Sequence, residues 1–158
     1  MSAKYSALIV DRDICTGCRS CEVVCSLVHE GCFWPEKARV HVYKKEADGQ
    51  DYPLVCRQCH EPACIEACVE EALYRDPGTG AVLVGSNCVG CGSCVDACPH
   101  EAVRLDRDSG KPLLCDLCGG EPACVQRCVV HALKYHDARG HVITAPVQAI
   151  TLPPEKLK

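Results

Sequence analysis

Sixteen of the seventeen cysteines fall into four blocks of four. The first and third blocks share the spacing C-x2-C-x2-C-x3-C, and the third is followed by Pro99. Two intervening residues bring successive thiolates around one small volume, as the corners of an iron–sulfur cubane require. The spacing predicts four [4Fe–4S] clusters, with these iron ligands: Cys15, Cys18, Cys21, Cys25; Cys56, Cys59, Cys64, Cys68; Cys88, Cys91, Cys94, Cys98; Cys115, Cys118, Cys124, Cys128.

Zinc and disulfide bonds are the alternative uses of so many cysteines. Structural zinc also binds four thiolates, but its sites use two C-x2-C pairs separated by a longer span, and a third closely spaced cysteine has no place in that pattern. A disulfide framework suits a short secreted chain, whereas this cysteine count is odd and no apolar signal segment follows Met1. Cluster ligation is therefore the favoured interpretation.

The composition indicates a chain that is held together by metal rather than by a large core. Its 158 residues include a single Trp, a single Phe and five Tyr, so the apolar side chains are mostly Val, Leu, Ala and Cys. Small domains of this kind fold together with metal insertion. We expect the cluster-free chain to be largely unfolded.

The formal net charge is −4. Each oxidised cluster with its four thiolates adds roughly −2, so the loaded chain should carry roughly −12. That charge disfavours nucleic acid and anionic membranes as partners, and no apolar run is long enough for membrane insertion. These features predict a cytoplasmic protein in the reducing compartment where thiolates persist.

The four blocks repeat in pairs. The first and third blocks are 73 positions apart, and Glu-Pro-Ala-Cys at 61–64 returns at 121–124. This pattern predicts one domain over residues 1–145 that is a duplicated two-block module. The first half is longer by 14 residues, which places a hairpin insertion at about 26–55.

Turn residues between short apolar runs predict β-hairpins after the blocks. In the insertion, an alternating strand at 38–43 is followed by the turn Asp48-Gly49 and a return strand at 52–55. Helices of a single turn are expected to begin near the fourth cysteine of each block. The predicted fold class is α+β, and the other expected hairpins span 73–84, 103–114 and 133–144.

The order of the blocks, the Glu-Pro-Ala-Cys repeats and the stretch Cys-Ser-Leu-Val-His-Glu-Gly at 25–31 resemble the four-cluster polyferredoxin electron-transfer subunits. The likeness covers about residues 5–145, and Pro35 with Ala38-Arg39-Val40 is similar to the small subunit of tungsten aldehyde oxidoreductases. The resemblance implies duplicated bacterial ferredoxin-like modules.

It also implies a function and partners. The chain would relay single electrons to or from a separate, larger catalytic subunit of a tungsten or molybdenum aldehyde or formate oxidoreductase, with a flavin or ferredoxin-type redox protein as a further partner. It would not itself be an enzyme. A nickel hydrogenase or carbon monoxide dehydrogenase system and a free polyferredoxin carrier are the alternatives.

The same resemblance implies crossed ligand sets, in which the fourth cysteine of each block serves another block's cluster. The implied sets are Cys15, Cys18, Cys21 and Cys128; Cys115, Cys118, Cys124 and Cys25; Cys88, Cys91, Cys94 and Cys68; and Cys56, Cys59, Cys64 and Cys98. This pairing would place the clusters in a row.

Other residues invite weaker predictions. Cys32 lies outside the blocks and is interpreted as a buried small apolar residue. His60 and His100 are interpreted as surface histidines, because every block already has four cysteines. The tail at 146–158 is interpreted either as a loosely ordered terminus or as a docking arm for a neighbouring subunit, and self-association into a longer relay is a further hypothesis.

Overall fold

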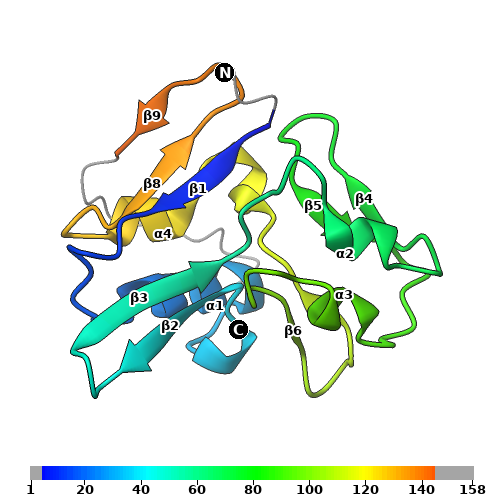
Figure 1. Cartoon of the computed structure of the whole chain (residues 1–158), viewed down its shortest axis with the longest axis horizontal. Coiled ribbons are helices and arrows are strands. Elements are labelled where there is room, and N and C mark those ends of the chain that lie inside the picture. Colours follow the sequence, from blue (N-terminus) through cyan, green and yellow to red (C-terminus); the bar gives the residue numbers. More distant parts are fainter. Residues whose placement is uncertain (1–4, 145–158) are drawn as a thin grey trace.

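The computed structural model describes residues 5–144, which form short helices and strands (Figure 1). The helices are α1 (Ser20–Glu30), α2 (Ala63–Glu66), α3 (Ser93–Asp96) and α4 (Ala123–Arg127), with 3-10 turns η1 (Pro35–Lys37) and η2 (Leu117–Gly120). The strands are β1 (Ala7–Val10), β2 (Val40–Lys45), β3 (Gln50–Val55), β4 (Leu73–Arg75), β5 (Val82–Val84), β6 (Arg104–Leu105), β7 (Pro112–Leu113), β8 (Leu133–His136) and β9 (Val142–Ile143). The predicted α+β class is confirmed.

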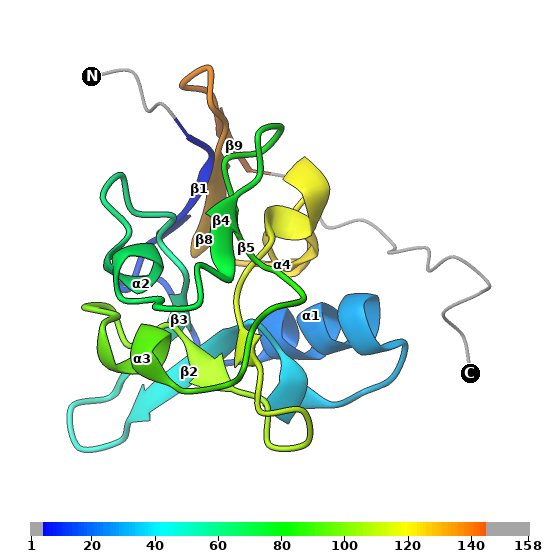
Figure 2. The same ribbon diagram turned by 90° about the vertical axis from the view of Figure 1, so that its right-hand side faces the viewer.

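Segments from the two ends of the described chain meet in one sheet. Strand β1 lies antiparallel to β8, and β8 pairs with β9. The helices are also paired between distant parts of the chain: α1 packs against α4, and α2 packs against α3. Figures 1 and 2 both show α2 and α3 side by side, away from α1 and α4. The first cysteine block therefore lies near the fourth, and the second near the third.

The remaining strands form the hairpins β2–β3, β4–β5 and β6–β7. With β8–β9, these confirm the hairpins predicted after the blocks. Their turns are fixed by local polar contacts: the carboxylate of Asp76 accepts hydrogen bonds from the amide and hydroxyl of Thr79, as Asp106 does from Ser109. Strand β1 was not predicted, because its partner lies more than 120 residues further along the chain.

The predicted helix positions are wrong. Every helix begins one residue before the third cysteine of its block, not near the fourth. The preceding residue decides this start: Arg19 and Gly92 are left-handed there, and Pro62 and Pro122 have the fixed φ of proline. Helix α1 also exceeds the single turn predicted, since it continues through Cys25 to the left-handed cap Gly31.

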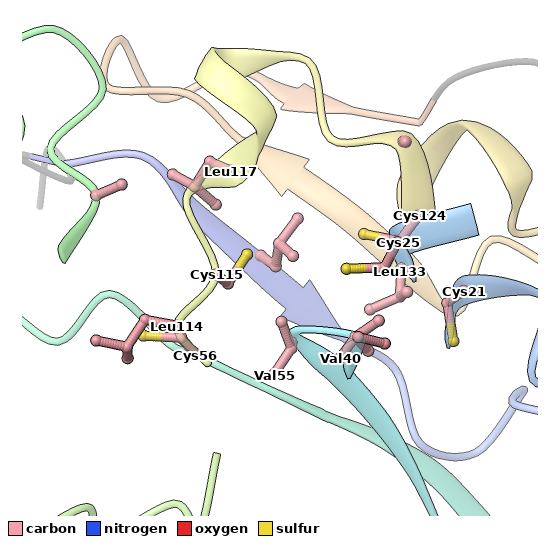
Figure 3. Packing of buried hydrophobic residues seen from close by; sticks show 14 of the residues in the cluster. Cys21, Cys25, Val40, Val55, Cys56, Leu114, Cys115, Leu117, Cys124 and Leu133 are labelled. Carbon is pink, nitrogen blue, oxygen red and sulfur yellow. The ribbon is translucent and has the colours of Figure 1, made fainter. Parts of the chain in front are cut away.

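Cysteines form part of the hydrophobic core. Figure 3 shows the sulfur atoms of Cys25 and Cys124 close together near Leu133, with Cys115 and Cys56 further along the same core. The only Phe and Trp of the chain, Phe33 and Trp34, lie on the surface instead. The core therefore consists largely of small aliphatic side chains and thiols, as the composition predicted.

Within residues 5–144 no helix is long and apolar enough to cross a bilayer. The predicted docking arm at 146–158 lies outside the described residues.

Candidate iron–sulfur centres

The sixteen block cysteines gather into four groups. Group A lines one hollow, group D lines another, and the thiols of groups B and C lie within electrostatic range of one another. The structure thus brings together the four sets that the resemblance implied. The groups are A (Cys15, Cys18, Cys21, Cys128), B (Cys25, Cys115, Cys118, Cys124), C (Cys56, Cys59, Cys64, Cys98) and D (Cys68, Cys88, Cys91, Cys94).

A left-handed residue stands two positions after the first cysteine of every block. These residues are Gly17, Gln58, Gly90 and Leu117, with φ of 64°, 51°, 73° and 56°. The left-handed turn folds the loop back on its cysteine, so that the amides of Gly17, Gln58 and Leu117 donate to the sulfurs of Cys15, Cys56 and Cys115. Four converging thiols with inward amides fit the needs of a [4Fe–4S] cluster.

The fourth cysteine has a turn of its own. Glu71 and His131, three positions after Cys68 and Cys128, are also left-handed. The next amide in each case, from Ala72 or Ala132, donates to the cysteine sulfur at 3.3 or 3.1 Å.

Cys25 lacks this turn because it lies inside α1, and the residue three positions after it is still part of the helix. Its sulfur accepts instead from the backbone amide of Arg39, at 3.1 Å. Arg39 directly precedes β2 of the insertion. The extra residues of the first half therefore supply the donor that the continuous helix removes.

Contacts between groups place them in one order. Cys21 of group A lies within electrostatic range of Cys124 of group B. Cys115 of group B has the same relation to Cys56 of group C, and Cys64 of group C to Cys94 of group D. The order is A, B, C, D, which the sequence repeats do not show by themselves.

The two ends of this row are the exposed ones. Cys18 of group A and Cys91 of group D are the only block cysteines that are exposed. Each sulfur lies near a serine hydroxyl two positions on, at 3.4 Å from Ser20 and 3.3 Å from Ser93. These hydroxyls lower the pKa of Cys18 and of Cys91.

Burial has the opposite effect on the pKa of the less accessible cysteines. It raises the pKa of Cys21 and Cys56 to about 12, and those of Cys94 and Cys118 to about 11. Without a metal these buried sulfurs would keep their protons at neutral pH. Iron binding supplies the positive charge that a buried thiolate needs.

Two polar side chains at the centres were not predicted. The Gln58 side chain is buried, donates to the carbonyl of Cys115 at 2.7 Å and accepts from the amide of Val82 at 2.9 Å. It therefore ties the loop of group C to a residue of group B. No local pattern marks it, because both partners are distant in sequence.

His29 is the second of these residues, and it lies against group B. Its Nδ1 donates to the carbonyl of Cys25 at 2.8 Å and lies 3.7 Å from the Cys25 sulfur, while its Nε2 donates to Asp116 at 3.0 Å. Burial opposes the charged ring, but the hydrogen bonds to Asp116 and Cys25 raise the pKa of His29 to about 10. Its four-residue spacing from Cys25 on α1 is the signal that could have found it.

Of the remaining predictions, the surface positions of His60 and His100 are confirmed. The interpretation of Cys32 as buried is wrong, since its side chain is exposed. It follows the cap of α1, where the chain leaves the core and turns outward.

Comparison with known proteins agrees with the cysteine pattern. Residues 47–138 match the 4Fe-4S dicluster domain, more than half of the chain. The chain therefore belongs to the 4Fe-4S dicluster domain family. The predicted resemblance to iron–sulfur electron-transfer subunits is confirmed at this level.

Three curated relatives and one solved structure illustrate the family. The polyferredoxin-like subunit of the aliphatic sulfonate oxidoreductase of Pyrococcus furiosus is 45% identical over 87 residues, covering 54% of this chain and 50% of the relative. The electron transport protein HydN of Escherichia coli is 35% identical over 91 residues, covering 53% and 50%. Subunit beta of the NADH-dependent phenylglyoxylate dehydrogenase of Aromatoleum evansii is 34% identical over 95 residues, covering 58% and 21%.

One structural neighbour is a chain in the BamBC active-site complex of benzoyl coenzyme A reductase. It is 30% identical, the TM-score is 0.51, and the match covers 82% of this chain and 75% of that one. The matched part of the chain spans half the length of the first two curated relatives and about a fifth of the third.

Proposed function

We propose that this chain is an electron-transfer subunit and that groups A to D each hold one [4Fe–4S] cluster. Each group offers four thiols, the ligand number that a [4Fe–4S] cluster needs. When bound, such clusters supply one-electron transfer at potentials that hydrogen bonds to sulfur, charge and exposure adjust. The residues of the chain would bind the clusters and shield them from solvent. None is assigned a role in making or breaking bonds, so we propose a non-catalytic subunit.

The order of the groups carries this proposal. The inner groups B and C contain no exposed cysteine, whereas the end groups A and D expose Cys18 and Cys91. This row suits electron passage between two separate surfaces. A storage or structural metal protein would have no need of this arrangement. The relatives support the same role, since those named above are described as polyferredoxin-like, electron-transport or oxidoreductase subunits.

We propose a larger catalytic oxidoreductase subunit as the partner, of the tungsten or molybdenum aldehyde or formate type, in the cytoplasm. The relative from Pyrococcus furiosus supports an oxidoreductase complex as the setting. Anaerobic purification from the native host, with analysis of iron, tungsten and molybdenum, tests this. A companion chain at fixed ratio with tungsten or molybdenum would support the proposal, whereas a chain that elutes alone would favour a free carrier.

The crossed ligand sets have a test of their own. Cys21→Ser and Cys128→Ser should each remove the same cluster, because both residues belong to group A. Cys25→Ser should remove a different one, although it lies only four residues from Cys21 on the same helix. Electron paramagnetic resonance of the reduced variants distinguishes the clusters. Loss of the same signal in Cys21→Ser and Cys25→Ser, with Cys128→Ser differing, would contradict the crossed sets.

A further inference from the structure

Group D opens onto an exposed surface that carries unusual apolar side chains. Val69, which follows Cys68, is 87% exposed, and Val89, which follows Cys88, is 67% exposed. Cys91 is also exposed, and Val89 and Glu70 line the same hollow, where the charge of Glu70 acts on the Cys91 sulfur. We define the Cys91 face as Val69, Glu70, Glu71, Val89 and Cys91.

The internal repeat makes this face distinctive. Each group takes three cysteines from one block and the fourth cysteine from another block. Two positions can therefore be compared between groups: the residue after the first of the three cysteines, and the residue after the fourth cysteine. In group D both are exposed valines. The equivalent residues are Thr16 and Val129 in group A, Asp116 and Ser26 in group B, and Arg57 and Pro99 in group C.

The stretch of sequence that carries Val69, Val89 and Cys91 is strongly negative. Residues 61–101 contain seven acidic residues and one basic residue, Arg75, and so carry a formal −6. The chain as a whole has 21 acidic and 17 basic residues, so all other residues together carry +2. Arg75 is counted in this sum; its guanidinium donates to the carbonyls of Gly80 and Cys59 and lies over the Tyr5 ring.

We propose that the Cys91 face docks a basic redox protein, one that surrounds an apolar centre with lysine or arginine side chains. This proposal rests on the proposed electron-transfer function and names a second partner for it. Two exposed valines provide the apolar contact, and the acidic surroundings select a partner of positive charge. Each encounter passes one electron: the chain loses it, the partner gains it, and no bond or proton is exchanged.

The experiment uses the anaerobically prepared, cluster-loaded chain, reduced with dithionite that is then removed. Mitochondrial cytochrome c serves as the probe, because it is basic and takes one electron. Val69→Ser should slow its reduction, whereas Val129→Ser, the same change at the equivalent position of group A, should leave the rate unchanged. If Val129→Ser slows the reaction and Val69→Ser does not, the face is wrongly assigned and the proposal fails.

Charge is tested by a second matched pair. The double variant Glu70→Gln with Glu71→Gln should slow cytochrome c reduction about tenfold at low ionic strength. The control Glu46→Gln with Asp48→Asn removes the same charge from the β2–β3 turn and should have little effect. The difference should shrink at about 0.15 M salt, where screening acts within about 8 Å. Equal slowing by the two doubles would overturn the local docking site.

Two further readouts separate this proposal from the proposed function. Reduction of menadione, a small neutral acceptor, should proceed at the same rate in every variant. If the wild-type chain takes no electrons from dithionite, the electron-transfer function itself fails. If it reduces menadione normally, but neither group D variant changes the rate of cytochrome c reduction, only the docking inference fails. A Val69-dependent dimer in sedimentation would mean that a second copy occupies the face, and would overturn the inference as well.

Discussion

Replacing Gln58 by Ala should weaken the connection between groups B and C. The Gln58 side chain is 4% exposed and serves two backbone groups, the carbonyl of Cys115 and the amide of Val82. Alanine leaves both without a partner, at about 1–3 kcal/mol each, so the expected loss is about 4 kcal/mol. That is a large part of the stability of a typical domain, which is about 5–15 kcal/mol.

The measurable result is faster cluster loss. Cluster release on unfolding is irreversible, so stability is best read as a rate, by the decay of visible absorbance in a fixed, anaerobic guanidinium solution. If the whole loss lowers the unfolding barrier, the rate should rise about a thousandfold, since about 1.4 kcal/mol corresponds to a factor of ten.

The controls separate hydrogen bonding from packing. Gln50→Ala changes an exposed glutamine in β3 and should alter the rate little. Gln58→Leu keeps the volume but makes neither hydrogen bond, and should be nearly as damaging as alanine. A rate for Gln58→Ala equal to that of Gln50→Ala would refute the reasoning, and rescue by leucine would assign the effect to packing.

Three further predictions concern the ligand loops. Gly17→Ala should reduce iron from about 16 to about 12 per chain, because the new Cβ would lie 1.9 Å from a carboxylate oxygen and 2.8 Å from the Cβ of Asp51, so that the loop and strand β3 must move apart; full iron content would contradict this. Cys32→Ser should leave iron and electron transfer unchanged while removing an exposed thiol, so a loss of iron would make Cys32 a ligand. Iron uptake should fall as pH falls. Burial raises the pKa of Cys21 and Cys56 to about 12, so each thiol must lose a proton before its sulfur binds iron. Equal reconstitution at pH values of about 6.5 and about 8.5 would count against this effect of burial.

Much of the fold followed from local signals. The hairpins were predictable because turn residues such as Asp76 and Asp106 bond to residues only three positions away. Strand β1 and the β1–β8 pairing were not, because nothing near Leu8 indicates a partner at Tyr135. The helix starts have only a partial local signal: Pro62, Gly92 and Pro122 favour a break before the helix, but nothing in the sequence marks Arg19 as left-handed.

The cysteine groups were predictable in membership but not in surroundings. The crossed sets came from the resemblance, and the spacing alone leaves the fourth cysteine free to join any neighbour. Gln58 contacts Cys115, 57 positions away, and no spacing in the sequence reveals that contact. The contact of His29 with Cys25 spans only four residues of α1, but its second partner, Asp116, is 87 positions away. The exposure of Cys91 likewise does not follow from the C-x2-C pattern, since Cys59 and Cys118 at the equivalent positions are half-buried.

The central claim is that one chain holds four [4Fe–4S] clusters in the groups A to D. Native mass spectrometry of the anaerobically loaded chain, with iron and sulfide determined on the same sample, tests it most directly. The account predicts a single loaded species with about 16 iron and about 16 inorganic sulfide atoms per chain. A fully loaded species with about half that iron, or one with zinc in place of iron, would contradict it.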